Sequence, residues 1–289
     1  LLQSSAASDV YKRQVMSMVP IGAAVTDGYN AGHGLPFDSE GMKKRYPDIF
    51  FSQFTGAELV ADKWNLSRED LDQFALESHQ KAAHATESQY FDREILPVEG
   101  KNAEGINDLV MADEGIRFDA SLDKLAGLNP VTEGGKITAG NASQITDGAA
   151  AVLICNDAGL KKIKSNPRAE IVSISVVGDD PVFMLTGPIP ASHKALDIAK
   201  LSIEDMDIYE VNEAFAPVPL AWAEELKADR SKLNVNGGAM ALGHPLGATG
   251  AKLMTTMLHE LERREGNYAL QAICEGGGTA NATIIKRIT

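Results

Sequence analysis

The chain contains few cysteines, fewer basic than acidic residues, and no long apolar run. Cys155 and Cys274 are its only cysteines among 289 residues, far apart and without C-x-x-C spacing. We therefore expect neither zinc nor a disulfide framework, and we expect a reducing compartment, the cytoplasm. Lys and Arg number 27 against 40 Asp and Glu, which gives a net charge of −13. An acidic surface argues against nucleic acids and anionic membranes as partners, but it permits an anionic small ligand.

No stretch of the chain approaches the roughly 18 apolar residues of a membrane-spanning helix. With 44% hydrophobic and 23% charged residues, the composition is that of a globular protein with one large domain or two smaller ones. Residues 1–14 lack an initiator methionine, the pattern of a signal peptide and a core-facing period. We expect them to be a leader foreign to the fold, or else a flexible native terminus.

The first half of the chain carries one strong helix signal. Ser67 followed by Asp70 is a variant of the capping box, and apolar residues then recur on one face as far as about Glu87. Residues 15–57 are rich in Gly, Pro and Asp, and we predict loops and short turns there. Residues 91–136 are charged and weakly patterned. Such a long excursion is more often a functional insertion than a linker.

The second half of the chain alternates β-branched or apolar strands with amphipathic helices. This order predicts an α/β fold, in which helices cover a sheet and active residues gather at the strand ends. Predicted strands occupy residues 171–177, 208–211, 270–274 and 282–285, and predicted helices occupy residues 191–200, 219–227 and 252–264.

Residues 234–250 form a glycine-rich stretch with a single histidine, His244. Its five glycines allow positive φ and a close approach of the backbone to a ligand. Pro245 pushes His244 out of the helical region, and the helix that follows favours negative charge at its N-terminus. A phosphate-binding P-loop or a dinucleotide fingerprint needs a different spacing of Gly and Lys, so we set both aside. His244 is therefore expected in a tight loop suited to chemistry.

Three polar or reactive side chains share a similar placement. Asn212 follows one predicted strand, Cys274 ends another, and His244 lies in the glycine loop. Cys274 precedes three glycines, whose backbone amides can stabilise an oxyanion. His and Cys are the residues whose pKa can be set near neutrality for proton transfer. For each residue alone a structural role is the more common one, and it is the repeated placement that favours an active site.

These residues resemble the signatures of the thiolases, the acetyl-CoA acyltransferases. The resemblance runs from about Val15 to Thr289, and details of residues 50–58 and 274–281 are most similar to actinobacterial-type degradative thiolases, including those that act on steroid side chains. The matching segments are Thr138-Ala-Gly-Asn-Ala-Ser143, Gly187-Pro-Ile-Pro190, Asn212-Glu-Ala-Phe-Ala216, Asn234-Val-Asn-Gly-Gly-Ala239, Gly243-His-Pro-Leu-Gly-Ala-Thr-Gly250 and Cys274-Glu-Gly-Gly-Gly278.

The resemblance implies a ping-pong acyl transfer through a cysteine thioester, with coenzyme A as co-substrate and no other cofactor or metal. His244 would be the base that activates the nucleophilic cysteine and, with a water held by Asn212, the first oxyanion hole. Cys274 would be the acid/base at the α-carbon of the acetyl unit. The Gly276 amide would belong to the second oxyanion hole.

The resemblance also implies a coenzyme site and a division of the chain. Ser143 would meet the pantetheine arm, and Arg117 would contact the nucleotide end of coenzyme A. Residues 15–145 would be an inserted loop domain over the coenzyme, residues 146–168 a remnant of the N-terminal thiolase half, and residues 169–289 the C-terminal half. The expected fold is the layered αβαβα fold of thiolases with an incomplete N-terminal half. A homodimer or homotetramer is expected for the full-length protein.

Two departures from the thiolase pattern matter. The nucleophilic cysteine of thiolases precedes the loop domain, and Cys155 cannot replace it, because it ends a predicted buried strand in a segment that matches no catalytic motif. We therefore expect a chain that lacks its nucleophile and is inactive alone. Many thiolases also carry a His-Met pair where this sequence has Ser52-Gln53, so the acyl-chain preference stays open.

Several functions remain open at this point. The leading hypothesis is a degradative 3-ketoacyl-CoA thiolase that forms acetyl-CoA and a shortened acyl-CoA. Alternatives are a non-catalytic thiolase-like protein that binds acyl-CoA and an acetoacetyl-CoA-forming thiolase. A condensing ketosynthase fits less well, because Cys274 with its three glycines favours a thiolase, and a nicotinamide enzyme would need a dinucleotide in the glycine loop.

Overall fold

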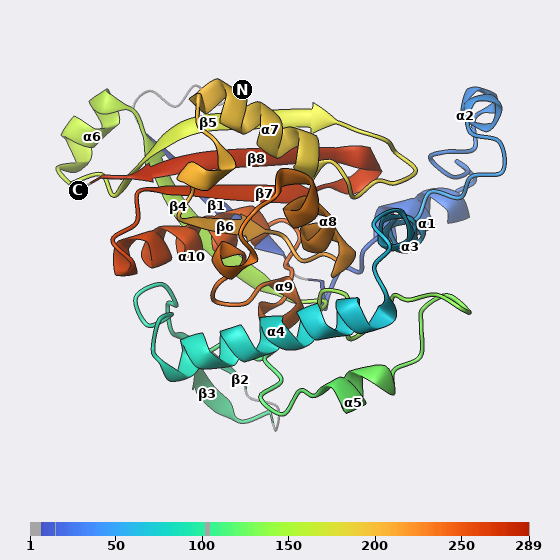
Figure 1. The fold of residues 1–289 in the computed structure, drawn as a ribbon, viewed down its shortest axis with the longest axis horizontal. Coiled ribbons are helices and arrows are strands. Elements are labelled where there is room, and N and C mark those ends of the chain that lie inside the picture. The colour runs from blue at the N-terminus through green and yellow to red at the C-terminus, as the bar shows by residue number, and fades with distance from the viewer. Residues whose placement is uncertain (1–6, 15, 102–104, 289) are drawn as a thin grey trace.

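A mixed four-stranded sheet forms the centre of the second half of the chain (Figure 1). The computed structural model describes the backbone of residues 7–14, together with residues 16–101 and 105–288 in full. The order in the sheet is β5 (Ala169–Gly178), β8 (Thr279–Arg287), β7 (Tyr268–Cys274) and β6 (Ile208–Val211). Neighbouring strands are antiparallel except β6 and β7, which are parallel. All four predicted strands and the α/β fold are confirmed.

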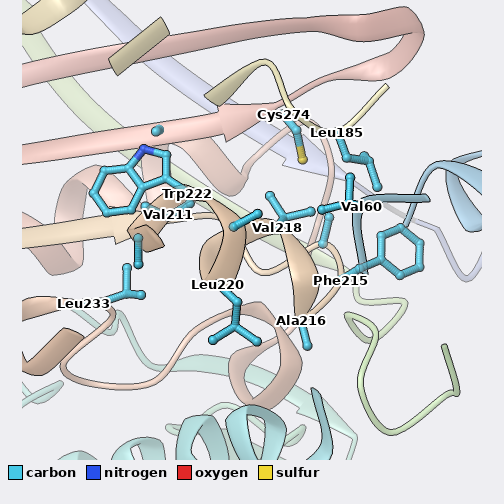
Figure 2. Close-up of a cluster of buried hydrophobic side chains, with 14 of the residues drawn as sticks. Val60, Leu185, Val211, Phe215, Ala216, Val218, Leu220, Trp222, Leu233 and Cys274 are labelled. Atoms are coloured by element: carbon cyan, nitrogen blue, oxygen red, sulfur yellow. The ribbon is translucent and has the colours of Figure 1, made fainter. Parts of the chain in front are cut away.

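Helices cover both faces of this sheet. The apolar side chains of α7 (Pro188–Ala199) and α8 (Pro217–Leu226) pack on one face, where Trp222 is fully buried in the largest core cluster (Figure 2). Helix α10 (Thr249–Arg263) packs Met257 and Leu261 on the opposite face. The alternation of side chains along β6 produces this division, because Ile208 faces α10 and Tyr209 faces α8.

Helix α4 (Arg68–Glu87) runs across the molecule beneath this layer (Figure 1). The Ser67 side chain accepts a hydrogen bond from the Asp70 backbone N–H, and the Asp70 carboxylate accepts one from the Ser67 N–H. The predicted capping box and helix are confirmed. Helix α4 contacts the short helix α9 (Ala239–Leu242), which leads into the His244 loop.

Residues 15–57 contain helices where we predicted loops and short turns. They are α1 (Ala23–Asn30), α2 (Glu40–Arg45) and the start of α3 (Gln53–Lys63). The prediction was wrong because α1 and α2 have no buried residue, so neither carries the apolar stripe on which a helix prediction depends. Residues 91–136 likewise contain the hairpin β2 (Val98–Lys101) and β3 (Asn107–Val110) and the helix α5 (Leu122–Ala126).

The strand β4 (Gly148–Cys155) is paired with β1 (Ala7–Gln14) in an antiparallel ladder and is followed by α6 (Asp157–Ile163). The strand at Cys155 was predicted, but it is not buried: its side chains alternate between half-buried and exposed. Residues 7–14 are not the flexible terminus that was one of the two expectations, because β4 supplies backbone partners for a strand there. Residues 1–6 lie outside the described residues. Among the described residues, every helix is too short or too polar to cross a bilayer.

Candidate active site

Asn212 and Cys274 lie at the same edge of the sheet. Asn212 directly follows β6, and its backbone N–H donates to the Ala272 carbonyl of β7 at 3.0 Å. Cys274 is the last residue of β7, and residues 276–278 then form a 3-10 turn with positive φ at Gly277. Because β6 and β7 are parallel, their carboxyl ends meet at one edge. The sequence prediction that each of these residues stands at the end of a strand is confirmed, and the structure shows that the two strands are neighbours.

The His244 loop reaches this edge from the start of α10. Gly243 has φ of 82°, and a side chain there would collide with Thr146. The His244 backbone N–H donates to the Gln144 carbonyl at 3.2 Å. These contacts, with Pro245 behind the histidine, fix the direction in which the imidazole points.

Hydrogen bonds define which nitrogen of His244 carries the proton. The Thr249 hydroxyl donates to the Pro245 carbonyl at 3.1 Å, and its oxygen lies 2.6 Å from His244 Nδ1. With its proton used there, the hydroxyl accepts from Nδ1–H. Nε2 is then the unprotonated nitrogen, and it faces Asn212 Nδ2 at 3.4 Å. The loop therefore presents a basic nitrogen next to Asn212.

The surroundings keep His244 neutral. Burial, and to a lesser degree the Lys252 cation, lower the pKa of His244 to about 4. The Asn212 side chain is buried, and its Oδ1 has no hydrogen-bond partner among the described residues. The amide can therefore orient the imidazole through Nδ2 while its oxygen accepts a further donor.

Cys274 is buried in the same apolar cluster as Leu185 and Val218 (Figure 2). Burial raises the pKa of the Cys274 thiol to about 12, its own backbone N–H and the Asn212 side chain oppose that rise, and the Glu275 carboxylate adds to it. The thiol is therefore protonated at neutral pH. The turn beside it is open, because Gly276 is exposed and stands first in the 3-10 turn.

The buried Glu213 carboxylate connects the Asn212 segment to helices α4 and α9. No role was predicted for this residue from the sequence. Glu213 accepts hydrogen bonds from Asn234 Nδ2 at 2.8 Å, the Ser78 hydroxyl at 2.7 Å and the Met240 N–H at 3.1 Å. Asn234 also exchanges two 2.9 Å hydrogen bonds with the backbone of Val211. Glu213 thus ties α4 and α9 to the segment beside Asn212. Its position after Asn212 in the shared motif was the one available signal.

A surface cleft of about 390 Å³ lies between α5, the residue 139–144 loop and α4. Arg117 and Lys124 line it and supply positive charge, although Lys124 is also paired with Asp119. Ser143 does not line this cleft: it is half-buried, and its backbone N–H donates to the Ala214 carbonyl at 2.9 Å. The structure therefore brings Arg117, but not the Ser143 side chain, to the cleft.

Two family descriptions match this chain. The thiolase N-terminal domain matches residues 15–158, and the thiolase C-terminal domain matches residues 165–287. The chain belongs to the thiolase family, as the motifs and the α/β fold indicate.

Individual relatives agree with this assignment. The steroid 3-ketoacyl-CoA thiolase FadA6 of Mycobacterium tuberculosis (strain ATCC 25618 / H37Rv) is 53% identical over 276 residues, 95% of this chain and 66% of the relative. The acetyl-CoA acetyltransferase of Paracoccus denitrificans is 40% identical over 95% of this chain and 71% of its own length. Human mitochondrial 3-ketoacyl-CoA thiolase in complex with CoA has a TM-score of 0.84 at 37% identity, covering 98% of this chain and 71% of that structure. The chain thus spans about two thirds of these proteins.

Proposed function

We propose that this chain provides the acid/base and oxyanion groups of a degradative thiolase, which cleaves a 3-ketoacyl-CoA with coenzyme A into acetyl-CoA and a shortened acyl-CoA. The observation that carries this proposal is the convergence of a neutral His244, the Asn212 amide and the buried Cys274 thiol at the ends of β6 and β7. The names of the relatives, 3-ketoacyl-CoA thiolase and acetyl-CoA acetyltransferase, support the same chemistry.

His244 has two consecutive roles in this proposal. Its unprotonated Nε2 takes the proton of the nucleophilic thiol, and the thiolate attacks the 3-keto carbon. Nε2–H is then a donor to the negative oxygen that develops on that carbon, together with a water held by Asn212. Thr249 keeps Nδ1–H engaged at 2.6 Å throughout, so the proton enters and leaves at Nε2.

Cys274 acts on C2, the α-carbon of the acetyl unit that is released. When the bond between C2 and C3 breaks, its electron pair stays on the acetyl-CoA fragment as an enolate, and the Cys274 thiol gives that carbon its proton. A thiol with a pKa near 12 holds its proton until such a strong base forms, and the thiolate that remains is itself a strong base for the reverse step. The exposed Gly276 N–H would stabilise the enolate oxygen.

Coenzyme A is the expected second substrate, and it is the ligand of a related human thiolase structure. The cleft beside Arg117 and Lys124 offers positive charge for its phosphates within an otherwise acidic chain. Ser143 does not line the cleft, and its proposed contact with the pantetheine arm is supported only by its neighbour Gln144, which does. A homo-oligomeric assembly and a cytoplasmic location stay predictions.

Two kinds of acyl group are candidate substrates, namely steroid side chains and simple fatty acyl chains. The 53% identity to a steroid thiolase supports the first. Ser52, which occupies one position of the usual His-Met pair, caps α3 by accepting a hydrogen bond from the Phe54 N–H at 3.2 Å. Phe54 in turn packs against Phe215, three residues after Asn212, with ring centroids 5.5 Å apart. An aromatic contact therefore lies beside the Asn212 segment, next in the chain to the Ser52-Gln53 pair.

A half-reaction tests these assignments without needing the acylated thiol. The purified chain is incubated with acetyl-CoA in D₂O, and deuterium in the acetyl methyl group is followed by mass spectrometry. We expect exchange above the buffer rate, and a loss of about a hundredfold or more in Cys274→Ala, the usual contribution of a general acid/base. Cys155→Ser, on the half-exposed strand β4, is the matched control and should exchange like the wild type.

Two results would contradict the proposal. Deuterium exchange that is unchanged in Cys274→Ala would remove that residue from the acid/base role. Binding of acetyl-CoA with no exchange above buffer would favour the alternative, a thiolase-like protein that binds acyl-CoA without catalysis.

A further inference from the structure

The two walls of the coenzyme cleft come from segments that are far apart in the sequence. One wall is α5 with the turn after it, which contributes Leu125 and Leu128, and the other is the residue 139–144 loop with Gly140. The loop backbone packs directly on these leucines: a β-carbon added to Gly140 would lie 2.6 Å from both leucine side chains. The two walls are therefore in contact at Gly140.

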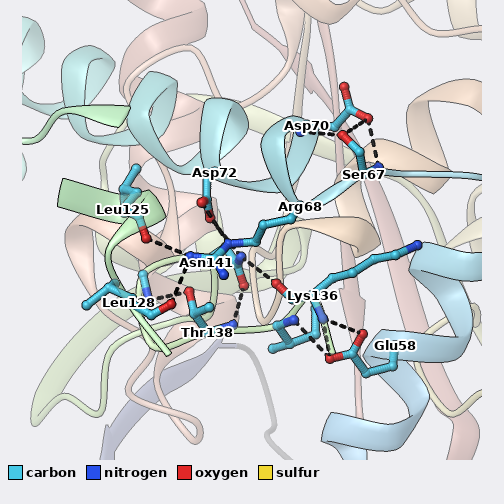
Figure 3. Close-up of polar contacts among 12 residues, drawn as sticks. Glu58, Ser67, Arg68, Asp70, Asp72, Leu125, Leu128, Lys136, Thr138 and Asn141 are labelled. Carbon is cyan, nitrogen blue, oxygen red and sulfur yellow. Dashed lines mark hydrogen bonds and ion pairs between the residues drawn. The ribbon is translucent and has the colours of Figure 1, made fainter. Parts of the chain in front are cut away.

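Arg68, at the start of α4, holds the first wall (Figure 3). Its Nη2 donates to the Leu125 carbonyl at 2.6 Å and to the Leu128 carbonyl at 3.2 Å, so it caps the C-terminal end of α5. Its Nε donates to Asp72 Oδ2 at 2.7 Å, one helical turn further along α4. Asp72 thereby fixes the direction in which the guanidinium points.

Asn141 holds the second wall and is bonded to the same carboxylate. Its Nδ2 donates to Asp72 Oδ1 at 2.9 Å and to the Lys136 carbonyl at 3.0 Å, while its Oδ1 accepts from the Thr138 N–H at 2.8 Å. Asn141 is fully buried and Asp72 is 3% exposed. Both carboxylate oxygens of Asp72 are therefore used, one for each wall of the cleft.

The second wall also continues to the catalytic edge of the sheet. The Asn141 carbonyl accepts from the Ala216 N–H at 2.9 Å, and Ala142 forms an isolated antiparallel bridge with Phe215. These residues belong to the segment that begins with Asn212. A shift of the residue 138–143 loop would thus be passed to that segment.

We propose that Asp72 is a positioning residue that sets the spacing of the coenzyme cleft and aligns it with the Asn212 segment. It does so by holding Arg68 and Asn141 at once. This inference rests on the proposed binding of coenzyme A. In Asp72→Asn, the amide keeps one acceptor oxygen and replaces the other with a donor. The charged Arg68 donor holds the remaining oxygen more strongly than the neutral Asn141 amide does, so the new N–H group faces Asn141 Nδ2 donor to donor. The second wall is then released.

The test compares coenzyme A affinity, measured by calorimetry on the 289-residue chain, in Asp72→Asn and in a matched control. The control is Glu77→Gln, the same loss of charge on the same helix at a residue that contacts Gln73 and Arg230 instead of the cleft. Asp72→Asn should weaken binding by about tenfold, the factor that a hydrogen bond to a charged group represents. Glu77→Gln should bind like the wild type.

A second variant, Arg68→Gln, affects only the first wall. It also tests the proposal if Asp72→Asn fails to fold. Arg68→Gln cannot reach the α5 carbonyls, and its side chain is partly exposed. It should weaken coenzyme A binding while the backbone amides of Thr138 and Ala216 exchange hydrogen as in the wild type. In Asp72→Asn both amides should exchange faster.

The outcomes distinguish this inference from the proposed function. If the wild type does not bind coenzyme A, the proposed coenzyme site is wrong, and amide exchange at Thr138 and Ala216 still tests the role of Asp72. If the wild type binds and both variants bind like Glu77→Gln, the positioning role is overturned. Unchanged amide exchange in Asp72→Asn overturns it as well, whatever the affinity.

Discussion

Two regions of this molecule differ in how their elements are held. The sheet region, residues 169–288, contains helices with buried faces on both sides of a sheet, and its core side chains are less than a tenth exposed. The arm, residues 16–52, contains α1 and α2, which have no buried residue. In Figure 1 α2 lies away from the sheet. The arm instead exposes large apolar side chains such as Met18 and Phe50.

The difference shows what places the active residues. In the sheet region, packing fixes strands, and strands fix Asn212 and Cys274 at one edge. In the arm, caps and local hydrogen bonds form the helices: the Ser39 side chain accepts from the Met42 backbone N–H at the start of α2. Local bonds alone stabilise short helices weakly. Identical substitutions in the two regions should therefore have very different effects.

The largest contrast is expected for removal of an aromatic side chain. Trp222 is fully buried, donates to the Ser192 hydroxyl at 2.8 Å and packs against Tyr209. Trp222→Ala should lower the free energy of unfolding by about 3–5 kcal/mol. Phe50→Ala, at a side chain 79% exposed, should change it by less than about 0.5 kcal/mol. Urea unfolding followed by circular dichroism measures both, and a Phe50→Ala loss as large as that of Trp222→Ala would show that the arm is packed after all.

The same contrast explains what could be predicted from the sequence. Strands β5 and β7 were predicted within two residues at each end, because strands that pack in a core have recognisable runs of β-branched and apolar residues. Helix α4 was predicted from its capping box. Helices α1 and α2 were missed, because a helix that buries nothing has no periodic apolar residues to reveal it.

The candidate site was predicted in part for related reasons. Asn212, His244 and Cys274 stand out in the sequence because each stands at the end of a predicted strand or beside glycines. Glu213 and Asp72 do not stand out, since Glu213 depends in part on Ser78, 135 residues away, and Asp72 on Asn141, 69 residues away. One sequence does not show such distant pairs. The positions of Arg117 and the cleft likewise follow from tertiary packing.

The next effect in size concerns pH. Burial lowers the pKa of His244 to about 4, so folding favours the neutral imidazole. The stabilisation is complete above the unfolded value of about 6.5 and is lost as pH falls from there toward 4. His244→Gln should flatten the dependence of the unfolding free energy on pH within that window. His33→Gln, the same substitution at an exposed residue of the arm, is the control. A wild-type slope that survives in His244→Gln would assign the effect to another group.

Replacing glycine by alanine should lower the stability of the sheet region but not that of the arm. A β-carbon at Gly238 would fall inside the Glu213 carboxylate, which is held by Asn234 and Ser78 and cannot move aside. Gly238→Ala should destabilise the fold by about 1–3 kcal/mol through overpacking. Gly41, inside α2, has open space around its α-carbon, so Gly41→Ala should be neutral or raise helix content slightly. Thermal unfolding of both variants is the measurement, and equal losses would contradict the difference.

The smallest effect is expected for helix caps. Ser67 caps α4 and Ser39 caps α2, and each hydroxyl accepts from the backbone N–H three residues on, at 3.1 and 3.3 Å. Ser67→Ala should lower the free energy of unfolding by about 1 kcal/mol, because α4 is packed and its cap is lost only when the protein unfolds. Ser39→Ala should fray α2 and leave global unfolding unchanged.

The effect of Ser67→Ala on stability should depend on pH, whereas the effect of Ser39→Ala should not. Hydrogen bonds from the Ser67 backbone and side chain lower the pKa of Asp70, so its contribution is present at neutral pH and is lost as pH falls through that lowered value. The gap between Ser67→Ala and the wild type should therefore narrow in acid. Ser39 has no such reciprocal carboxylate, so Ser39→Ala should show no comparable narrowing. If the Ser67→Ala gap stays constant from neutral to acid pH, the hydroxyl acts as a simple cap, and its own hydrogen bond to the Asp70 carboxylate contributes nothing to stability.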